Sequence, residues 1–273
     1  MITRVLRKFL SPLYGKKKYQ PLFESLYRMS LTGMNIGGGT NVADSGELNV
    51  LHYISSKMGK GSRAVIFDVG ANIGDYSLLL HEVFGDAAEI HSFEPSAKTY
   101  AELVRNLDGK VKGTRHHFGL GDRENRTSLY SNADGSGLAS VYKRKLDHFN
   151  IDMNQVEEIE IRTLDGFCKD RGIDHILFLK LDVEGHEKKV LEGAGQMLAA
   201  GKIDFIQFEF GGTNIDSRTF FQDFYYILHD HYNIYRIVKD GIYPVQGYGE
   251  VYESFLPTNY LAERKDPGPK EGT

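Results

Sequence analysis

Acidic residues end four apolar runs of the sequence. They are Asp68, Glu94, Asp122 and Asp182. If these runs are parallel strands, their carboxyl ends meet at one edge of a sheet, where ligands of α/β proteins bind. Because carboxylates are costly to bury unless they bind something, the four acids predict a ligand site rich in hydrogen-bond acceptors.

The first acid begins the segment Asp68-Val69-Gly70-Ala71-Asn72-Ile73-Gly74. Glycines let a backbone turn sharply and approach a ligand closely, and a helix after this segment would point its N-terminus at the same place. A dinucleotide-binding loop carries three glycines in the pattern G-x-G-x-x-G, whereas this loop has two, with Asn72 between them. An ordinary strand–helix turn is the alternative interpretation.

The next two acids extend the predicted site. Glu94 comes twenty residues after Gly74, where a carboxylate can accept hydrogen bonds from both hydroxyls of a ribose. Asp122 follows Gly119-Leu120-Gly121, and its carboxylate could accept from the exocyclic amine of adenine. A solvated strand-end acid and a simple turn are the respective alternatives.

The segment Lys180–Glu187 brings further polar groups to the end of the fourth run. The alternation of a strand places Lys180 and Asp182 on one face, with Glu184 and His186 just beyond. Glu187 is better explained as an acid that stabilises the first turn of the next helix.

The elements that must position these residues alternate between strand and helix. We expect helices at 76–84, 97–107, 165–171, 188–199 and 220–229, and strands at 64–69, 89–93, 111–118, 176–181, 205–210, 234–238, 242–245 and 258–263. Residues 123–163 are irregular or a β-excursion, and Asp240-Gly241 is a favoured hairpin turn. This alternation predicts an α/β fold with a mainly parallel sheet covered on both faces.

The first 58 residues differ from the rest. Apolar residues three to four apart predict helix over 1–33, which Pro12 and Gly15 split in two; a loop and a further helix, 47–58, follow. Residues 1–20 carry six basic residues and no acid, so the other 253 carry a net charge of −10 against −4 for the whole chain. This basic segment could pack on the domain, pair with a second copy in a homodimer, or contact an anionic membrane surface.

Composition excludes several classes of function. An acidic body argues against a nucleic-acid partner, and no apolar run reaches the ~18 residues needed to span a bilayer. The single cysteine, Cys168, allows no disulfide within the chain and fits a reducing compartment, so we expect a cytoplasmic protein. There is no P-loop, no zinc H-E-x-x-H pattern and no G-x-S-x-G elbow.

Residues 45–264 resemble the FkbM-type S-adenosylmethionine-dependent methyltransferases. The motifs that carry the resemblance are VIFDVGANIGDYS, IHSFEPS, FGLGDREN and LFLKLDVEGHEKKVLEGA, with the later FIQFEFGGTNIDSRTFFQDFYYIL and TNYLAER. The resemblance implies a class I methyltransferase fold: a three-layer αβα sandwich whose seven-stranded, mainly parallel sheet ends in an antiparallel hairpin. It divides the chain into an N-terminal helical extension with a lid-like loop (1–58), a methyltransferase domain (59–264) and a flexible tail (265–273).

The resemblance also implies roles for individual residues. The methionine part of S-adenosylmethionine would lie against Asp68, Gly70, Asn72 and Gly74, with the ribose on Glu94 and the adenine near Asp122. The methyl group and the acceptor would lie beside Asp182. We further expect the loop 37–46 to act as a lid that brings Glu47 near the cofactor.

The reaction implied is methyl transfer to an oxygen of a sugar, a glycan or another small molecule. Such an enzyme must align the acceptor and remove its proton, for which His186, Asp182 and Glu184 are candidate bases. Glu209 and Asn214 are candidate acceptor contacts, and Asp182, Glu184 and Glu209 together could hold Mg²⁺. An NAD-dependent Rossmann oxidoreductase and a catalytically inactive cofactor-binding protein are the alternatives.

Overall fold

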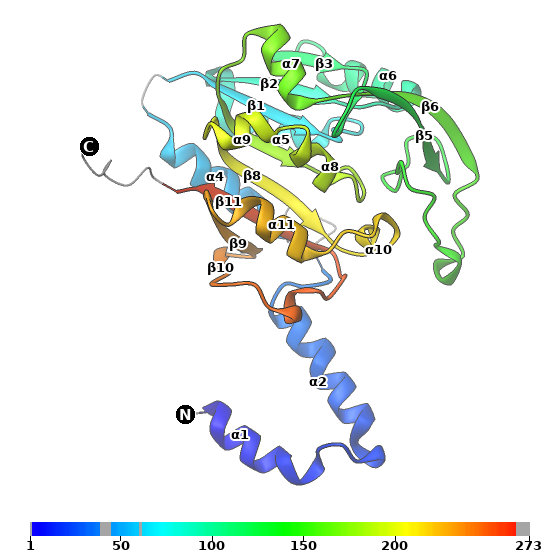
Figure 1. Ribbon diagram of the computed structural model, residues 1–273, viewed down its shortest axis with the longest axis vertical. Coiled ribbons are helices and arrows are strands. Elements are labelled where there is room, and N and C mark those ends of the chain that lie inside the picture. Colours follow the sequence, from blue (N-terminus) through cyan, green and yellow to red (C-terminus); the bar gives the residue numbers. More distant parts are fainter. Residues whose placement is uncertain (1, 39–44, 60–61, 266–273) are drawn as a thin grey trace.

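The computed structural model describes residues 2–38, 45–59 and 62–265. Its centre is one large sheet (Figure 1). In spatial order the strands are β10 (Gly241–Pro244), β9 (Tyr232–Val238), β11 (Thr258–Arg264), β8 (Ile203–Phe210), β7 (Ile176–Leu181), β1 (Ala64–Val69), β2 (Ala88–Phe93) and β3 (Gly113–His116).

The direction of the strands agrees with the predicted class I arrangement. Strands β3, β2, β1, β7 and β8 are parallel neighbours, whereas β11 runs antiparallel between β8 and β9. The described sheet has eight strands where the resemblance implied seven, because β10 adds an edge strand through the hairpin predicted at Asp240-Gly241. The carboxyl ends of the five parallel strands therefore share one edge.

Helices cover both faces, so the predicted three layers are confirmed. One face carries α4 (Glu47–Lys57), α5 (Asp75–Phe84) and α6 (Ala97–Leu107), and the other carries α7 (Leu164–Arg171), α8 (Glu187–Glu192), α9 (Gly195–Ala199) and α11 (Phe221–Leu228). Two apolar clusters of buried side chains, one on each face, hold the layers together. The short helix α10 (Thr213–Ser217) follows β8.

The helix expected over 188–199 is interrupted. It forms as α8 and α9, and between them the backbone at Gly193 lies close to that of Gly121. A β-carbon at position 193 would lie 1.9 Å from the carbonyl oxygen of Gly121, so only glycine fits this contact.

The segment between β3 and α7 forms a second, three-stranded sheet. Its strands are β4 (Gly119–Leu120), β6 (Gln155–Arg162) and β5 (Asn125–Ser131), in that order. The expected excursion over 123–163 therefore contains the two strands β5 and β6, joined by an irregular stretch over 132–154. Leu129, Ile159 and Ile161 form a small apolar cluster on one side of it, and we call this segment, residues 119–162, the insert sheet.

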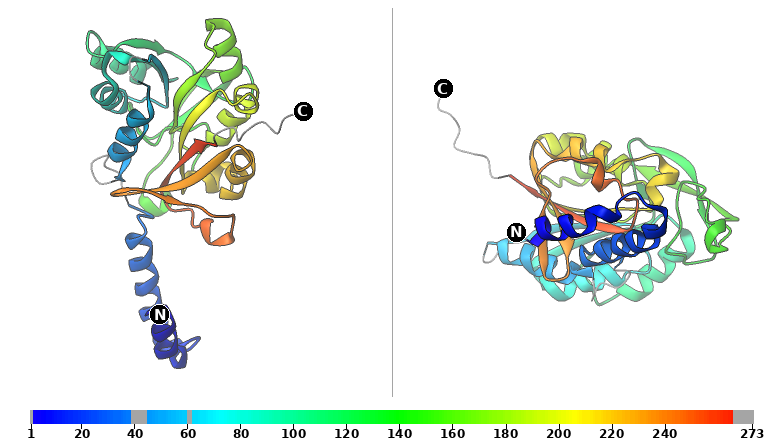
Figure 2. Two further views of the ribbon diagram at one scale, coloured as in Figure 1. Left: turned by 90° about the vertical axis from the view of Figure 1, so that its left-hand side faces the viewer. Right: turned by 90° about the horizontal axis from the view of Figure 1, so that it is seen from below.

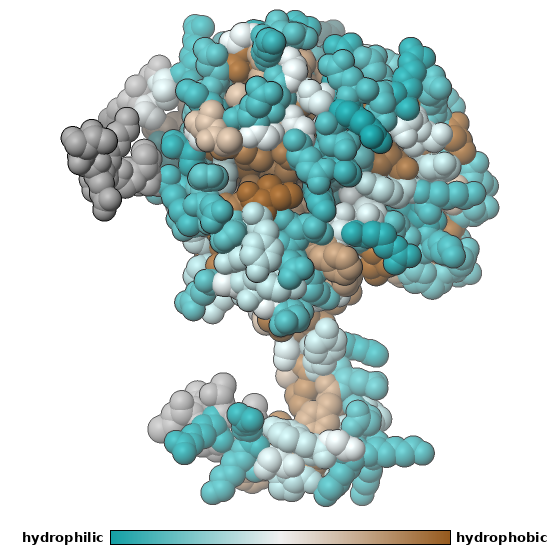
Figure 3. Space-filling model, viewed as in Figure 1, coloured by the Kyte–Doolittle hydropathy of each residue, from teal (hydrophilic) through white to brown (hydrophobic). Residues whose placement is uncertain are grey.

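The N-terminal residues form two helices, as predicted. Helix α1 (Ile2–Leu10) and helix α2 (Gln20–Gly33) are joined by short 3₁₀ turns at Ser11–Leu13 and Lys17–Tyr19. Both helices extend away from the domain (Figures 1 and 2), and apolar surface is visible along α2 in the space-filling view (Figure 3). Residues 39–44 of the predicted lid and 266–273 of the predicted tail lie outside the described residues. Within the described part of the chain, no helix has the length and apolar content needed to cross a bilayer.

Candidate cofactor-binding and active site

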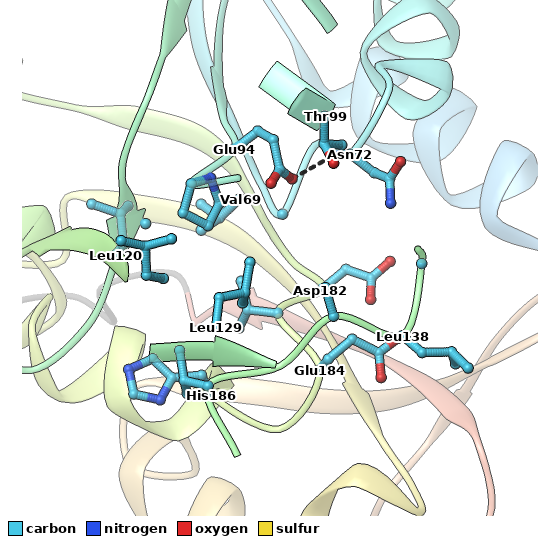
Figure 4. A pocket seen from close by; sticks show the side chains of 18 of the residues that line it. Val69, Asn72, Glu94, Thr99, Leu120, Leu129, Leu138, Asp182, Glu184 and His186 are labelled. Carbon is cyan, nitrogen blue, oxygen red and sulfur yellow. Dashed lines mark hydrogen bonds between the residues drawn. The ribbon is translucent and has the colours of Figure 1, made fainter. Parts of the chain in front are cut away.

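A cavity of about 460 Å³ opens where β1, β2, β7 and β8 end (Figure 4). Its polar lining comes from these strand ends, and its apolar lining comes largely from the insert sheet. A second cavity of about 370 Å³ adjoins it. The two cavities share the lining residues Gly70, Asn72, Gly137, Asp182 and Glu209. The predicted strand-end site is therefore a pair of connected compartments.

The loop after β1 separates the two compartments. Gly70 has φ +80°, and a β-carbon there would lie 1.9 Å from the carbonyl oxygen of Asp182. Asn72 has φ +47°, and its side-chain oxygen accepts from the backbone N–H of Ile73 at 2.7 Å. The short polar side chain of asparagine tolerates this left-handed conformation. The loop thus lies directly against the end of β7 because position 70 has no side chain.

Gly74 packs closely against α6. Its φ is +100°, and a β-carbon there would lie 2.9 Å from the side chains of both Leu103 and Leu107. Gly74 lines neither cavity, so it allows α5 to begin tightly packed on α6. A direct contact with the cofactor remains a prediction for this residue.

Glu94 follows β2 and points into the larger cavity (Figure 4). Its carboxylate accepts from the backbone N–H of Asn72 at 3.2 Å and of Ser96 at 2.8 Å. Burial raises the pKa of Glu94 to about 7, although these two hydrogen bonds act in the opposite direction. Glu94 is therefore a fixed acceptor at the place predicted for a ribose, and it titrates near neutral pH.

The insert sheet supplies an apolar wall that the sequence analysis did not predict. Leu129, Ile159 and Ile161 line the larger cavity together with Leu120 and Val141. A signal for this wall exists in β6, where Ile159 and Ile161 alternate with charged residues, as expected for a strand with one buried face. A flat aromatic base would fit against such a wall.

His186 lies at this apolar end of the cavity, on the side of Leu120 and away from Asp182 (Figure 4). Its Nδ1 lies 3.2 Å from the hydroxyl of Tyr142, and its ring packs beside Gly121. Burial lowers the pKa of His186 to about 4, so the ring is neutral at pH 7.

Asp122 also lies at this end but is not among the residues that line the cavity. Its carboxylate forms an ion pair with Lys189 at 3.1 Å on α8. Its predicted contact with adenine therefore remains a prediction.

Lys180 joins two of the predicted acids beneath the smaller cavity. The buried ammonium lies 3.4 Å from Asp68 Oδ1 and 3.3 Å from Asp182 Oδ2, and 4.5 Å from the centre of the Tyr76 ring. Burial alone would lower the pKa of Lys180, but Asp68, Asp182 and Glu47 raise it overall. The predicted placement of Lys180 and Asp182 on one face is confirmed. Lys180 also lines the smaller cavity, a role that the sequence did not predict.

Asp68 lies below the surface of the site. Its side chain is fully buried, lines neither cavity, and accepts from the Ser77 hydroxyl at 2.6 Å. Its observed contacts hold Lys180 and the start of α5, so a direct contact with the methionine part of a cofactor remains a prediction.

Glu184 lines the larger cavity in an unusual backbone conformation. It has φ +52°, and its carboxylate forms an ion pair with Arg144 at 2.7 Å. Its carbonyl oxygen accepts from the hydroxyl of Ser140 at 2.7 Å, which ties the insert sheet to the end of β7. Burial and the charge of Asp182 raise the pKa of Glu184 to about 8, against the effect of Arg144.

Glu209 and Glu47 complete the group of carboxylates around the smaller cavity. Burial and then the negative charges of Asp182 and Glu184 raise the pKa of Glu209 well above its usual range. Glu47 accepts from Gln207 at 2.6 Å and from the Ser45 hydroxyl at 2.7 Å. Glu47 therefore lies at the smaller cavity, and its predicted position near the cofactor remains a prediction.

Asn214 lies behind the cavities. Its side-chain oxygen accepts from the backbone N–H of Gly211 at 2.8 Å, and the residue is fully buried. It fixes the turn that follows Glu209, so direct contact with an acceptor remains a prediction. No cluster of three or more acids, histidines or cysteines arranged for a metal ion occurs in the described ranges, and the ion pair of Glu184 with Arg144 already engages one of the proposed Mg²⁺ ligands.

Comparison with known proteins gives the family of this chain. The methyltransferase FkbM domain matches residues 68–237. The 2-O-methyltransferase NoeI of Sinorhizobium fredii is 26% identical over 155 residues, which cover 54% of this chain and 63% of that protein. The 31-O-demethyl-FK506 methyltransferase FkbM of Streptomyces tacrolimicus is 32% identical over 153 residues, which cover 47% of this chain and 58% of that protein. The match thus spans less than two thirds of either relative.

Among solved structures, an O-methyltransferase from Bacillus cereus aligns with 97% of this chain and all of its own at 10% identity, with a TM-score of 0.42, a likeness too distant to bear on function. The fold and the strand-end site define a class I methyltransferase. With the domain match over more than half of its length, the chain belongs to the FkbM family of S-adenosylmethionine-dependent methyltransferases.

Proposed function

We propose that this protein is an S-adenosylmethionine-dependent O-methyltransferase that acts on a hydroxyl of a sugar, a glycan or another small molecule. The observation that carries the proposal is the meeting of two cavities at Asp182 and Glu209. One compartment suits a nucleoside, and the other is lined by carboxylates. A methyl donor that spans both would place its sulfur at their junction.

The described residues fit this cofactor. Glu94 offers a carboxylate to the ribose hydroxyls, and the apolar wall of the insert sheet suits adenine. Asp182, Glu209 and Glu47 place several negative charges close together, which a cation at the junction would stabilise. When bound, S-adenosylmethionine supplies a methyl group on a positively charged sulfur, which is the charge that this group of carboxylates complements.

Proton removal from the acceptor is best assigned to the carboxylates at the junction. Asp182 and Glu209 line both compartments at their junction, and burial raises the pKa of Glu209, so its ionised form accepts a proton more strongly than an exposed carboxylate does. Asp182 is held beside it by Lys180 at 3.3 Å. His186 lies at the other end of the larger cavity with a pKa of about 4, and Glu184 is engaged by Arg144. We therefore assign the proton-accepting oxygen to the Asp182 and Glu209 pair.

The named activities of the relatives support oxygen as the acceptor atom, because both names specify O-methylation or its demethylated substrate. Among the three candidate bases from the sequence, the geometry favours Asp182. It also adds Glu209, which the sequence analysis placed only as an acceptor contact.

Transfer of an isotope-labelled methyl group to a panel of sugars, glycans and hydroxylated natural products tests the proposal. We expect Asp182→Asn and Glu209→Gln each to lower turnover about 100-fold or more, with S-adenosylhomocysteine affinity changed only a few-fold. Asp174→Asn, which removes an exposed acid far from the cavities, is the matched control. Near-normal turnover in both site variants would contradict the assignment, and binding of NAD in place of S-adenosylhomocysteine would favour an oxidoreductase.

A further inference from the structure

We call the segment 2–37 the arm. Among its described side chains, those that are buried are Leu31 and Ile36, near its C-terminal end. Asn35 donates to the carbonyl oxygens of Ser45 and Ile237 at 3.0 and 3.2 Å, and the backbone N–H of Gly37 donates to Pro257 at 3.0 Å. Helix α1 and the N-terminal part of α2 stand clear of the domain (Figures 1 and 2). The structure therefore does not support packing of the arm on its own domain.

The arm exposes large apolar side chains. Phe9 is 83% exposed, Met29 64% and Tyr27 59%, and Leu22 and Tyr14 are exposed as well. Among the described side chains of α1, the exposed Phe9 lies about 140° or more around the helix from Arg4 and Arg7 and 100° from Lys8 at 100° per residue. An exposed aromatic side chain opposite basic ones suits a partner that has an apolar layer beside a negatively charged one.

Positive charge gathers in the same part of the arm. The exposed residues Arg4, Arg7, Lys8 and the run Lys16–Lys18 supply all six basic residues of the first twenty, where no acid occurs. This charge is complementary to a negatively charged partner, and both an anionic bilayer and the acidic domain of a second copy meet that condition. The bilayer also offers an apolar layer to the exposed apolar side chains of the arm. Nucleic acid would satisfy the cations, but it offers little to the exposed Phe9, Tyr27 and Met29.

We propose that the arm binds the surface of an anionic lipid bilayer. Helix α1 would lie in the headgroup region with its apolar side toward the acyl chains and its basic side toward lipid phosphates. With nine residues it is too short to cross the bilayer. The basic run Lys16–Lys18 would then meet the same surface at the bend between α1 and α2.

The attachment of the arm places this contact near the site. Pro257, which receives the Gly37 hydrogen bond, lies two residues before Asn259, and Asn259 lines the smaller cavity together with Glu47. An arm docked on a bilayer would therefore hold the open end of the site at a set orientation to the surface. The surface contact itself does not depend on which reaction the site performs.

Sedimentation of the full chain with vesicles tests the proposal. We expect binding to phosphatidylcholine vesicles that contain 30% phosphatidylglycerol, with affinity that falls as salt is raised, and weak binding to phosphatidylcholine alone. Each basic residue near an anionic surface contributes about fivefold in affinity. Lys16→Gln/Lys17→Gln/Lys18→Gln should therefore weaken binding about 100-fold, and Phe9→Ser about tenfold or more.

The triple variant Lys110→Gln/Lys169→Gln/Lys202→Gln removes the same charge from exposed positions on the domain and should bind like the unmodified protein. Equal loss in this control would mean that only net charge matters and would overturn the proposal. Equal binding to neutral vesicles would overturn it too. A homodimer that depends on the arm in sedimentation velocity, with no binding to vesicles, would overturn it as well. The same holds if polyuridylic acid displaces the protein from vesicles and displaces the Phe9→Ser variant equally well. S-adenosylhomocysteine affinity, measured on each arm variant, should stay unchanged and so keeps this test separate from that of the proposed reaction.

Discussion

Replacing Glu94 by glutamine should remove most of the pH dependence of nucleoside binding between pH 6 and pH 8. The pKa of Glu94 is raised to about 7 by burial, so about 9% of the carboxyl is ionised at pH 6 and about 91% at pH 8. If the ionised form accepts the ribose hydroxyls, affinity for S-adenosylhomocysteine rises about tenfold over this range, which corresponds to about 1.4 kcal/mol. Affinity rises with pH because the ribose hydroxyls donate to the deprotonated carboxylate of Glu94, and more of it is deprotonated at high pH.

Glu94→Gln should also weaken binding at pH 8. Hydrogen bonds to a charged group contribute about 1.5–3 kcal/mol, so the loss of the charge is expected to cost about 10- to 150-fold in affinity. At pH 6 the gap between the two proteins should be about ten times smaller, between about 1- and 15-fold. Isothermal titration calorimetry at pH 6, 7 and 8 measures both effects.

Other carboxyls titrate in the same range, since burial also raises the pKa of Glu184 to about 8 and of Glu187 to about 7. Comparing how steeply S-adenosylhomocysteine affinity rises with pH in the unmodified protein and in Glu94→Gln separates the contribution of Glu94 from that of the other carboxyls. If Glu94→Gln keeps the full tenfold rise, the carboxyl does not hold the ribose and the nucleoside lies elsewhere.

Three further predictions concern the frame of the site. Gly70→Ala should destabilise the fold by more than about 2 kcal/mol in urea unfolding, since its methyl group would meet the backbone at the end of β7. The control Gly172→Ala, at φ +64° with open space around it, should destabilise the fold by only about 1 kcal/mol. Equal losses of stability in the two variants would contradict the close approach at Gly70. Lys180→Met should cost about 3–5 kcal/mol because it leaves the buried carboxylate of Asp68 uncompensated, and unchanged thermal stability would show that the pair is not coupled. Stability should fall by about 1.5–2 kcal/mol between pH 7 and pH 8, because the raised pKa values of Glu94, Glu184 and Glu187 favour the native state at low pH and this gain is lost as pH rises through about 7–8. The lowered pKa values of His116 and His186 act in the opposite direction only below about pH 6.5. A urea midpoint that rises from pH 7 to pH 8 would contradict these signs.

The parallel core of the fold was predictable because each buried strand is an apolar run that ends in a polar residue. The hairpin β9–β10 followed from Asp240-Gly241 in the same way. The position of β11 was not predictable, since its pattern does not reveal that it inserts between β8 and β9. Pairing between strands distant in the sequence depends on tertiary packing and leaves little local trace.

At the site, the sequence indicated which acids gather but not which of them face the cavity. Asp68 and Asp182 both come at strand ends, yet Asp68 is fully buried whereas Asp182 lines both compartments. Burial at a strand end depends on where the neighbouring helix packs, and Gly74 controls that contact here. The apolar wall of the insert sheet was overlooked because its residues lie far from the motifs, although the alternation in β6 records it.

A crystal structure of the full chain with S-adenosylhomocysteine is the most direct test of the account. We predict that the adenine lies against Leu129 and Ile159, that both ribose hydroxyls donate to the Glu94 carboxylate, and that the sulfur lies between Asp182 and Glu209. A nucleoside bound outside the 460 Å³ cavity, or a sulfur far from both carboxylates, would contradict the proposed site.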